Sequence, residues 1–320
     1  MPFIFLFIRS STTCACGIYF RTYSEKSHQL ALLSSCASFR VAGILSLGGL
    51  LFVRRKTKDD ENPPVPSVFG TPTKHELPWK LQKNTGNREA IAGTLLVVVY
   101  FLTGFISQQI DEILYILEGN GVLMSVAMHR SLQVLFGHFS WVLIGSTIIR
   151  KLAGPFFTRE TDWFRSKWNT FWLGWVMGGY FVSSWLFNVA DLVNQLVLPA
   201  SLWSTTEGVV AQLINPENND FIASIFGFIA PCLSAPWWEE VLYRGFMLPA
   251  LARHLPVWMS VVVSGFIFSI HHMSPTGFLP LWTLGMVWAG LYLKCRNILV
   301  TIIIHAMWNS RVFLGSWLGL

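Results

Sequence analysis

Two adjacent carboxylates and a guanidinium lie in one of the most apolar regions of this chain. They belong to the segment APWWEEVLYRGFMLPAL, in which Glu239 and Glu240 are followed by Arg244. On a helix, Glu240 and Arg244 stand at i and i+4, so they can pair across one turn with the acid on the N-terminal side. Glu239 points about 100° away and lacks that partner. The group is therefore either a structural ion-pair cluster or a brace beside a carboxylate that is available for general base catalysis.

Further polar side chains interrupt two later apolar stretches. His271 and His272 end the run FIFSIHHMS, and His305 and Asn309 stand four residues apart in IIIHAMWNS. His305 and Asn309 must share a helical face, so both can point at one site. A histidine can accept or donate a proton near neutral pH, and an Asn amide can donate to a developing oxyanion. These side chains are either satisfied packing residues or members of one site with Glu239, and their presence on two helices after the carboxylates favours the site.

The composition predicts that membrane helices position these residues. Of the 320 residues, 52% are hydrophobic and only 12% are charged, about half the charged share of a typical soluble protein. Apolar runs of about the length that crosses a bilayer occur at 90–106, 131–149, 169–189, 221–238, 257–273, 278–293 and 298–320. A shorter apolar piece at 192–203 is an eighth span, a re-entrant segment or a surface helix. We predict an all-α, polytopic transmembrane helical bundle of about 7–8 spans.

The N-terminal region has a different character. Residues 1–56 contain one acid, Glu25, against seven Lys and Arg, and are rich in serine. This composition predicts an organelle transit peptide, with a secretory signal as the competing interpretation. Residues 57–88 are charged and Pro-rich, which indicates a linker before a transmembrane domain at 89–320. We expect a multi-pass protein of a chloroplast membrane, with a mitochondrial or endoplasmic reticulum membrane as the alternative.

Three motifs resemble those of the CAAX prenyl protease 2-like intramembrane proteases, also called the CPBP or Abi family. The family signature is EExxxR, then FxxxH, then HxxxN or HxxxD, on successive transmembrane helices. The chain carries these motifs, in this order, as Glu239-Glu240-Val-Leu-Tyr-Arg244, Phe268-Ser-Ile-His-His272 and His305-Ala-Met-Trp-Asn309. The resemblance covers roughly residues 221–313, and the FxxxH spacing selects His272 over His271.

The resemblance implies hydrolysis of a peptide bond within the membrane. It implies that Glu239 and His272 activate a water, that His305 and Asn309 stabilise the oxyanion, and that Glu240 and Arg244 support the site. The expected partners are the lipid bilayer and a peptide or membrane-protein substrate. No nucleic-acid partner is expected, because the net charge of +6 comes largely from the N-terminal region. Farnesylated CAAX substrates are not implied, since that activity belongs to an endoplasmic reticulum branch of the family.

A metal-dependent mechanism is one alternative. Glu239, His272 and His305 would supply two imidazoles and one carboxylate, a ligand set that suits zinc with an open water position. The sequence contains no HExxH motif, however, and Asn309 is a poor zinc ligand. We therefore predict water activation without a cofactor, and we keep zinc as the alternative.

A function without catalysis is the second alternative. A fold alone does not establish an activity, so these helices could form a non-proteolytic organelle membrane scaffold or assembly factor. The presence of all three motifs, with Glu239 in place, favours the endopeptidase.

Overall fold

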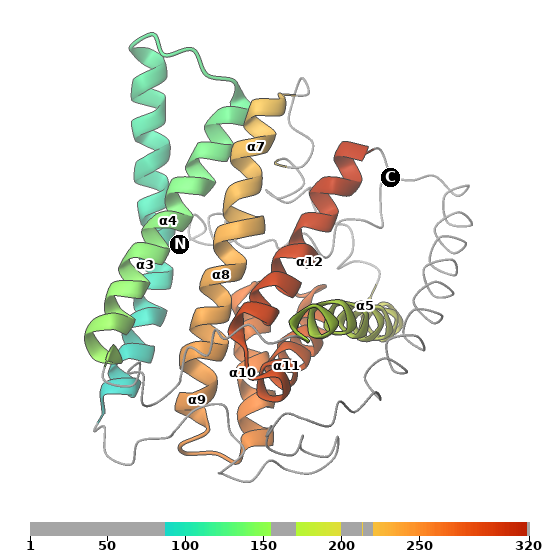
Figure 1. The fold of residues 1–320 in the computed structure, drawn as a ribbon. Helices are drawn as coiled ribbons and strands as arrows, with labels where there is room; N and C mark the ends of the chain where they lie inside the picture. Colours follow the sequence, from blue (N-terminus) through green and yellow to red (C-terminus); the bar gives the residue numbers. More distant parts are fainter. Residues whose placement is uncertain (1–86, 155–170, 200–212, 214–219, 319–320) are drawn as a thin grey trace.

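The computed structural model describes residues 87–154, 171–199, 213 and 220–318, and every regular element in these ranges is helical (Figure 1). The α-helices are α3 (Arg88–Gly119), α4 (Val126–Leu152), α5 (Trp172–Val197), α7 (Phe221–Ile229), α8 (Ala235–Glu240), α9 (Leu248–Leu251), α10 (Val257–His271), α11 (Phe278–Cys295) and α12 (Ile298–Leu318). Two π-helical segments, η4 (Ala230–Ser234) and η5 (Val241–Met247), join α7, α8 and α9. The resulting continuous helix, Phe221–Leu251, is called the central rod below.

The predicted all-α membrane bundle is confirmed in the described part of the chain. Within the described residues, six helices are long and apolar enough to cross a membrane: α3, α4, α5, the central rod, α11 and α12. Helix α10 is also apolar but has only 15 residues, fewer than the roughly 20 that a perpendicular span needs. The polytopic architecture therefore follows from these seven apolar helices.

Two predicted boundaries differ from the structure. The first predicted span, 90–106, is part of the 32-residue helix α3, which continues through the more polar residues up to Gly119. The apolar piece at 192–203 does not begin a separate helix, because residues 192–197 form the last turns of α5. Its residues 200–203 lie outside the described residues. The predicted transit peptide at 1–56 and all but the end of the linker at 57–88 also lie outside them, so both remain predictions.

The helices that carry the three motifs pack against one another. Helix α12 contacts α8 and both π-helical segments, and α10 packs along α11. Gly265 of α10 and Gly285 of α11 meet so closely that a Cβ atom on Gly285 would lie 2.7 Å from the Cα atom of Gly265. Small residues of this kind let two membrane helices approach at the backbone. The central rod, α10, α11 and α12 therefore enclose a common interior.

Helices α3, α4 and α5 surround that interior. Figure 1 shows α3 and α4 running side by side next to the central rod, while α5 crosses in front of α11. Contacts join α3 to α4, α4 to α7, and α5 to both α11 and α12. The large side chains that are almost completely buried lie mainly on the rod, α10, α11 and α12: Trp238, Trp288, Trp308, Arg244, Tyr243, Tyr292, Phe268 and Phe313. The tightest packing is thus around the motif-bearing helices.

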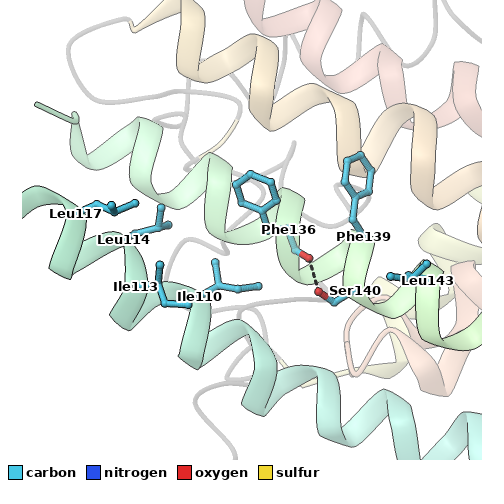
Figure 2. Close-up of a pocket in the computed structure, with 8 residues that line it drawn as sticks. All are labelled: Ile110, Ile113, Leu114, Leu117, Phe136, Phe139, Ser140 and Leu143. Atoms are coloured by element: carbon cyan, nitrogen blue, oxygen red, sulfur yellow. Dashed lines mark hydrogen bonds between the residues drawn. The ribbon is translucent and has the colours of Figure 1, made fainter. Parts of the chain in front are cut away.

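An apolar groove lies between α3 and α4 (Figure 2). Its lining is Ile110, Ile113, Leu114, Leu117, Phe136, Phe139, Ser140 and Leu143. The Ser140 hydroxyl donates to the Phe136 carbonyl over 2.9 Å, so the one polar side chain in the lining bonds within its own helix. Such a surface suits contact with lipid chains, and none of the predicted site residues lies on it.

Candidate active site

The two motif glutamates stand at the end of α8, between two π-helical segments. Pro231 and Pro236 lie in the first positions of η4 and α8, where a proline lacks the N–H that the regular helix pattern requires. Interruptions of this kind are frequent at functional sites, because they redirect side chains within an otherwise continuous helix. Glu239 is 8% exposed and Glu240 is completely buried. The rod therefore carries two carboxylates into the bundle interior.

Glu240 and Arg244 form the ion pair that the i,i+4 spacing predicted. Arg244 Nη1 donates to Glu240 Oε1 over 2.7 Å, and Arg244 Nη2 donates to the Gly285 carbonyl over 3.0 Å. The guanidinium carbon also lies 5.2 Å from the centre of the Phe268 ring, within cation–π range. The pair thus links the rod to α11 and α10 while neutralising a buried charge.

His272 follows the last residue of α10, and its ring orientation is set by its own helix. Its Nδ1 atom lies 2.7 Å from the Phe268 carbonyl oxygen. A carbonyl can only accept, so Nδ1 carries the hydrogen and the neutral ring presents a lone pair at Nε2. The chain then turns away at Met273, whose φ of 49° is left-handed. The FxxxH spacing therefore places the carbonyl that orients the histidine one helical turn before it.

His305 lies in the middle of α12 and is oriented by Glu240. Its Nδ1 atom is 3.1 Å from Glu240 Oε1, the same oxygen that accepts from Arg244. Since a carboxylate paired with a guanidinium is an acceptor, Nδ1 of His305 donates and its Nε2 also presents a lone pair. The ring lies against the Trp288 indole, with 4.3 Å between ring centres.

The two imidazoles converge on Glu239. Nε2 of His272 and Nε2 of His305 each lie 3.8 Å from Glu239 Oε2. That buried oxygen has no hydrogen-bond partner among the described residues. A separation of 3.8 Å is too long for a direct hydrogen bond but suits groups that are bridged by a water. Glu239 Oε2 is thus flanked by two further acceptor atoms, the Nε2 atoms of His272 and His305.

Asn309 lies one turn beyond His305 on α12. Its Nδ2 donates to the Pro231 carbonyl over 2.8 Å, and the residue is 6% exposed. The amide therefore joins α12 to η4, on the rod that carries Glu239. Its predicted contact with an oxyanion stays a prediction.

His271 belongs to different surroundings from His272. Its ring centre is 4.2 Å from that of Tyr100 on α3, and its backbone carbonyl accepts from the Tyr100 hydroxyl over 2.9 Å. The rings of His271 and His272 lie at 84° to each other. Adjacent residues of a helix point about 100° apart, which accounts for this divergence, and of the two histidines only His272 approaches Glu239.

Sequence reasoning missed two buried neighbours of the site, Trp288 and Ser183. The Trp288 indole packs on His305 and donates through Nε1 to the Ser183 hydroxyl over 3.0 Å. The chain contains 15 Trp, and neither residue belongs to a motif, so no pattern in the sequence singled them out.

The zinc alternative gains no support from the arrangement of its ligands. Among residues 87–154, 171–199, 213 and 220–318, no group of three or more His, Cys, Asp or Glu is arranged to hold a metal ion. Glu239, His272 and His305 do not form such a group. Metal dependence is therefore tested by chelation, as described below.

The comparison with protein families identifies the region that contains the site. Residues 221–311 match the family model described as type II CAAX prenyl endopeptidase Rce1-like. Neither the comparison with curated proteins nor that with solved structures gave a match. The matched segment begins at the first residue of α7, ends within α12 and contains all three motifs. This segment, the Rce1-like domain, is therefore similar to the family that the motifs predicted.

Proposed function

We propose that this chain is an intramembrane endopeptidase of the glutamate type, which hydrolyses a peptide bond with a water held by Glu239. The observation that carries the proposal is the position of Glu239 Oε2, 3.8 Å from Nε2 of both His272 and His305 inside the membrane bundle. The Rce1-like domain supports a membrane endopeptidase at the level of the family.

The reaction begins with a water between these three acceptors. The water donates one hydrogen to Glu239 Oε2 and the other to Nε2 of His272, which leaves an oxygen lone pair for the scissile carbonyl carbon. As the new C–O bond forms, Glu239 takes the proton as general base. The tetrahedral intermediate then releases the amine, which takes a proton from Glu239 as the C–N bond breaks. One water is consumed, and a carboxylic acid and an amine are formed.

The oxyanion of that intermediate is assigned to His305 and Asn309. In the resting arrangement, Nε2 of His305 is an acceptor, because Nδ1 carries the hydrogen bonded to Glu240. His305 can therefore donate to an oxyanion only after Nε2 gains a proton, a change that the Glu240 carboxylate beside Nδ1 favours and that burial of the ring opposes. Asn309 supplies a neutral amide donor on the same face of α12.

Glu240 and Arg244 act on the site indirectly. Their ion pair holds the oxygen to which His305 donates, and it attaches that oxygen to α11 through the Gly285 carbonyl. The pair thus fixes the ring of His305 while Glu239 remains available to the water.

The proposal extends to a chloroplast membrane as the location and to a peptide or membrane protein as the substrate. The chain is a multi-pass membrane protein by its helices. The plastid assignment rests on the acid-poor, serine-rich composition of residues 1–56. Fusion of these residues to a fluorescent protein should direct it into chloroplasts of plant cells. Fluorescence in the endoplasmic reticulum or in mitochondria would overturn the assignment.

The decisive experiment is proteolysis by the purified protein in detergent, with a library of peptides and membrane-anchored proteins as substrates. Wild type is compared with Glu239→Gln and with Glu112→Gln, a control glutamate on the exposed surface of α3. Each protein is assayed with and without a strong chelator. Cleavage that disappears only in Glu239→Gln and survives chelation supports the proposal.

Two other outcomes would contradict the proposal. Loss of cleavage on chelation would place Glu239, His272 and His305 in a metal site. Absence of cleavage by folded wild type, together with cellular complementation by Glu239→Gln, would assign the chain to the scaffold class.

A further inference from the structure

We propose that Trp288 of α11 and Ser183 of α5 are positioning residues, which hold the His305 ring in the orientation that hydrolysis requires. The inference rests on the proposed function, because it concerns the same site. It adds an element, α5, that lies upstream of the family match at 221–311.

A directional hydrogen-bond chain fixes the Trp288 indole. Trp288 Nε1 donates to Ser183 Oγ over 3.0 Å, and the Ser183 hydroxyl donates to the Gly179 carbonyl over 2.7 Å. An indole N–H can only donate, and the serine hydrogen is used within α5, so the direction of both bonds is determined. Ser183 is completely buried and Trp288 is 1% exposed. Water therefore has little access to replace either bond.

The fixed indole in turn restricts the His305 ring. The two ring centres are 4.3 Å apart, and the ring planes are inclined at 37°. The two nitrogens of His305 face different groups: Nδ1 donates to Glu240, and Nε2 lies 3.8 Å from Glu239 Oε2. A rotation of the imidazole about χ2 would lose both, and a packed indole face opposes that rotation. Trp288 thus restricts the plane of the ring and opposes its rotation, while the bond to Glu240 distinguishes the two nitrogens.

Small residues let α5 approach closely enough to supply Ser183. Gly179 lies one turn before Ser183, and a Cβ atom there would lie 2.6 Å from Ile304 Cδ1 of α12 and 3.0 Å from Leu291 Cδ1 of α11. Gly179 and Ser183 share a face of α5 that contacts both helices. The orientation of a predicted site residue on α12 therefore depends on a helix outside the Rce1-like domain.

The test combines kinetics with a spectroscopic signature of His305. Ser183→Ala leaves the buried Trp288 N–H without its acceptor, whereas Ser183→Thr keeps a hydroxyl. We expect Ser183→Ala to lower kcat about tenfold with KM changed by less than about twofold, and Ser183→Thr to restore most of the rate. Ser140→Ala is the matched control, because it removes the same kind of bond within a helix, on the α3–α4 groove.

The signature is the pair of ¹⁵N chemical shifts of the His305 imidazole, measured in protein labelled at histidine. These signals are assigned to His305 because they are missing from the spectrum of the His305→Gln variant. Wild type and Ser140→Ala should show a single form protonated at Nδ1. Ser183→Ala and Trp288→Leu should show mixed tautomers. If Ser183→Ala does not fold, Trp288→Phe provides the same test, since it keeps a ring but removes the N–H.

Unchanged His305 shifts in folded Ser183→Ala and Trp288→Leu would overturn the inference, even if kcat falls, because the effect would then not act through His305. The shifts do not depend on turnover. An inactive wild type with the expected shifts would therefore refute the proposed function while supporting the positioning of His305.

Discussion

Nδ1 of His305 lies 3.1 Å from Oε1 of Glu240, the oxygen that also accepts from Arg244 at 2.7 Å. This shared oxygen separates the roles of the two adjacent glutamates. Glu240 receives two donors at Oε1, although the Oε2 atoms of both glutamates have no hydrogen-bond partner within the described part of the chain. The difference between the two carboxylates is that Glu240 bonds Arg244 and His305, whereas Glu239 faces the Nε2 atoms of both histidines.

The side chains of Glu240 and Arg244 should be coupled in their effect on the free energy of unfolding. Arg244→Met leaves a buried carboxylate without its cation, which costs about 3–5 kcal/mol. The double variant Glu240→Gln/Arg244→Met removes both charges, and it should be less destabilised than the sum of the single variants. Thermal unfolding in detergent measures this double-mutant cycle. Additive single effects would show that the two side chains do not interact energetically.

Replacement of His272 should lower kcat strongly, whereas replacement of His271 should change it little. His272→Phe removes the Nε2 acceptor beside Glu239, and we expect kcat to fall about 10²–10⁴-fold. His271→Phe keeps a ring to pack on Tyr100. It should leave kcat within about threefold of wild type, because general base catalysis requires a group within reach of the water and His271 faces Tyr100 instead. Turnover by both purified variants provides the measurement. A larger loss for His271→Phe would exchange the assigned roles.

Asn309→Ala should weaken the rate more than substrate binding. If the amide donates to the oxyanion, its contribution appears mainly in the transition state, so kcat should fall about 10²–10³-fold while KM changes little. Separate determination of kcat and KM tests the role. The variant also loses the bond to the Pro231 carbonyl, so its unfolding temperature is measured in parallel. Unchanged turnover would count against the oxyanion contact.

Acid should weaken the N-terminal cap of α7, Asp220, which lies just before the membrane-spanning rod. The Ser125 hydroxyl donates to the Asp220 carboxylate over 2.5 Å, and the Ala223 N–H donates to its other oxygen. These two bonds, the first more than the second, hold the pKa of that carboxyl below its usual range. A lowered folded-state pKa gives stability that is present above about pH 4 and is lost as the pH falls through the folded-state value. Hydrogen exchange at the Ala223 amide should therefore show less protection at pH 3 than at pH 6, after correction for intrinsic rates. Asp220→Asn should reduce this difference, and equal dependence in the variant would refute the link.

Much of the local geometry was predictable because it depends on helical spacing alone. The i,i+4 pairing of Glu240 with Arg244 and the divergence of His271 from His272 both follow from 3.6 residues per turn. The length of α3 and the continuation of α5 through residue 197 were predicted less well, because mixed polar and apolar residues can extend a helix beyond its hydrophobic run.

The sequence by itself determined the membrane class, the motif residues and the helices that carry them, since hydropathy and helical periodicity act over neighbouring residues. Only the tertiary structure decided that His272 and His305 lie equally far from Glu239 and that both present Nε2. It also decided that Ser183 supports Trp288 behind His305. These relationships depend on how far each helix is shifted along its axis and rotated about it relative to its neighbours. The spacing of residues along one helix carries no information about that placement.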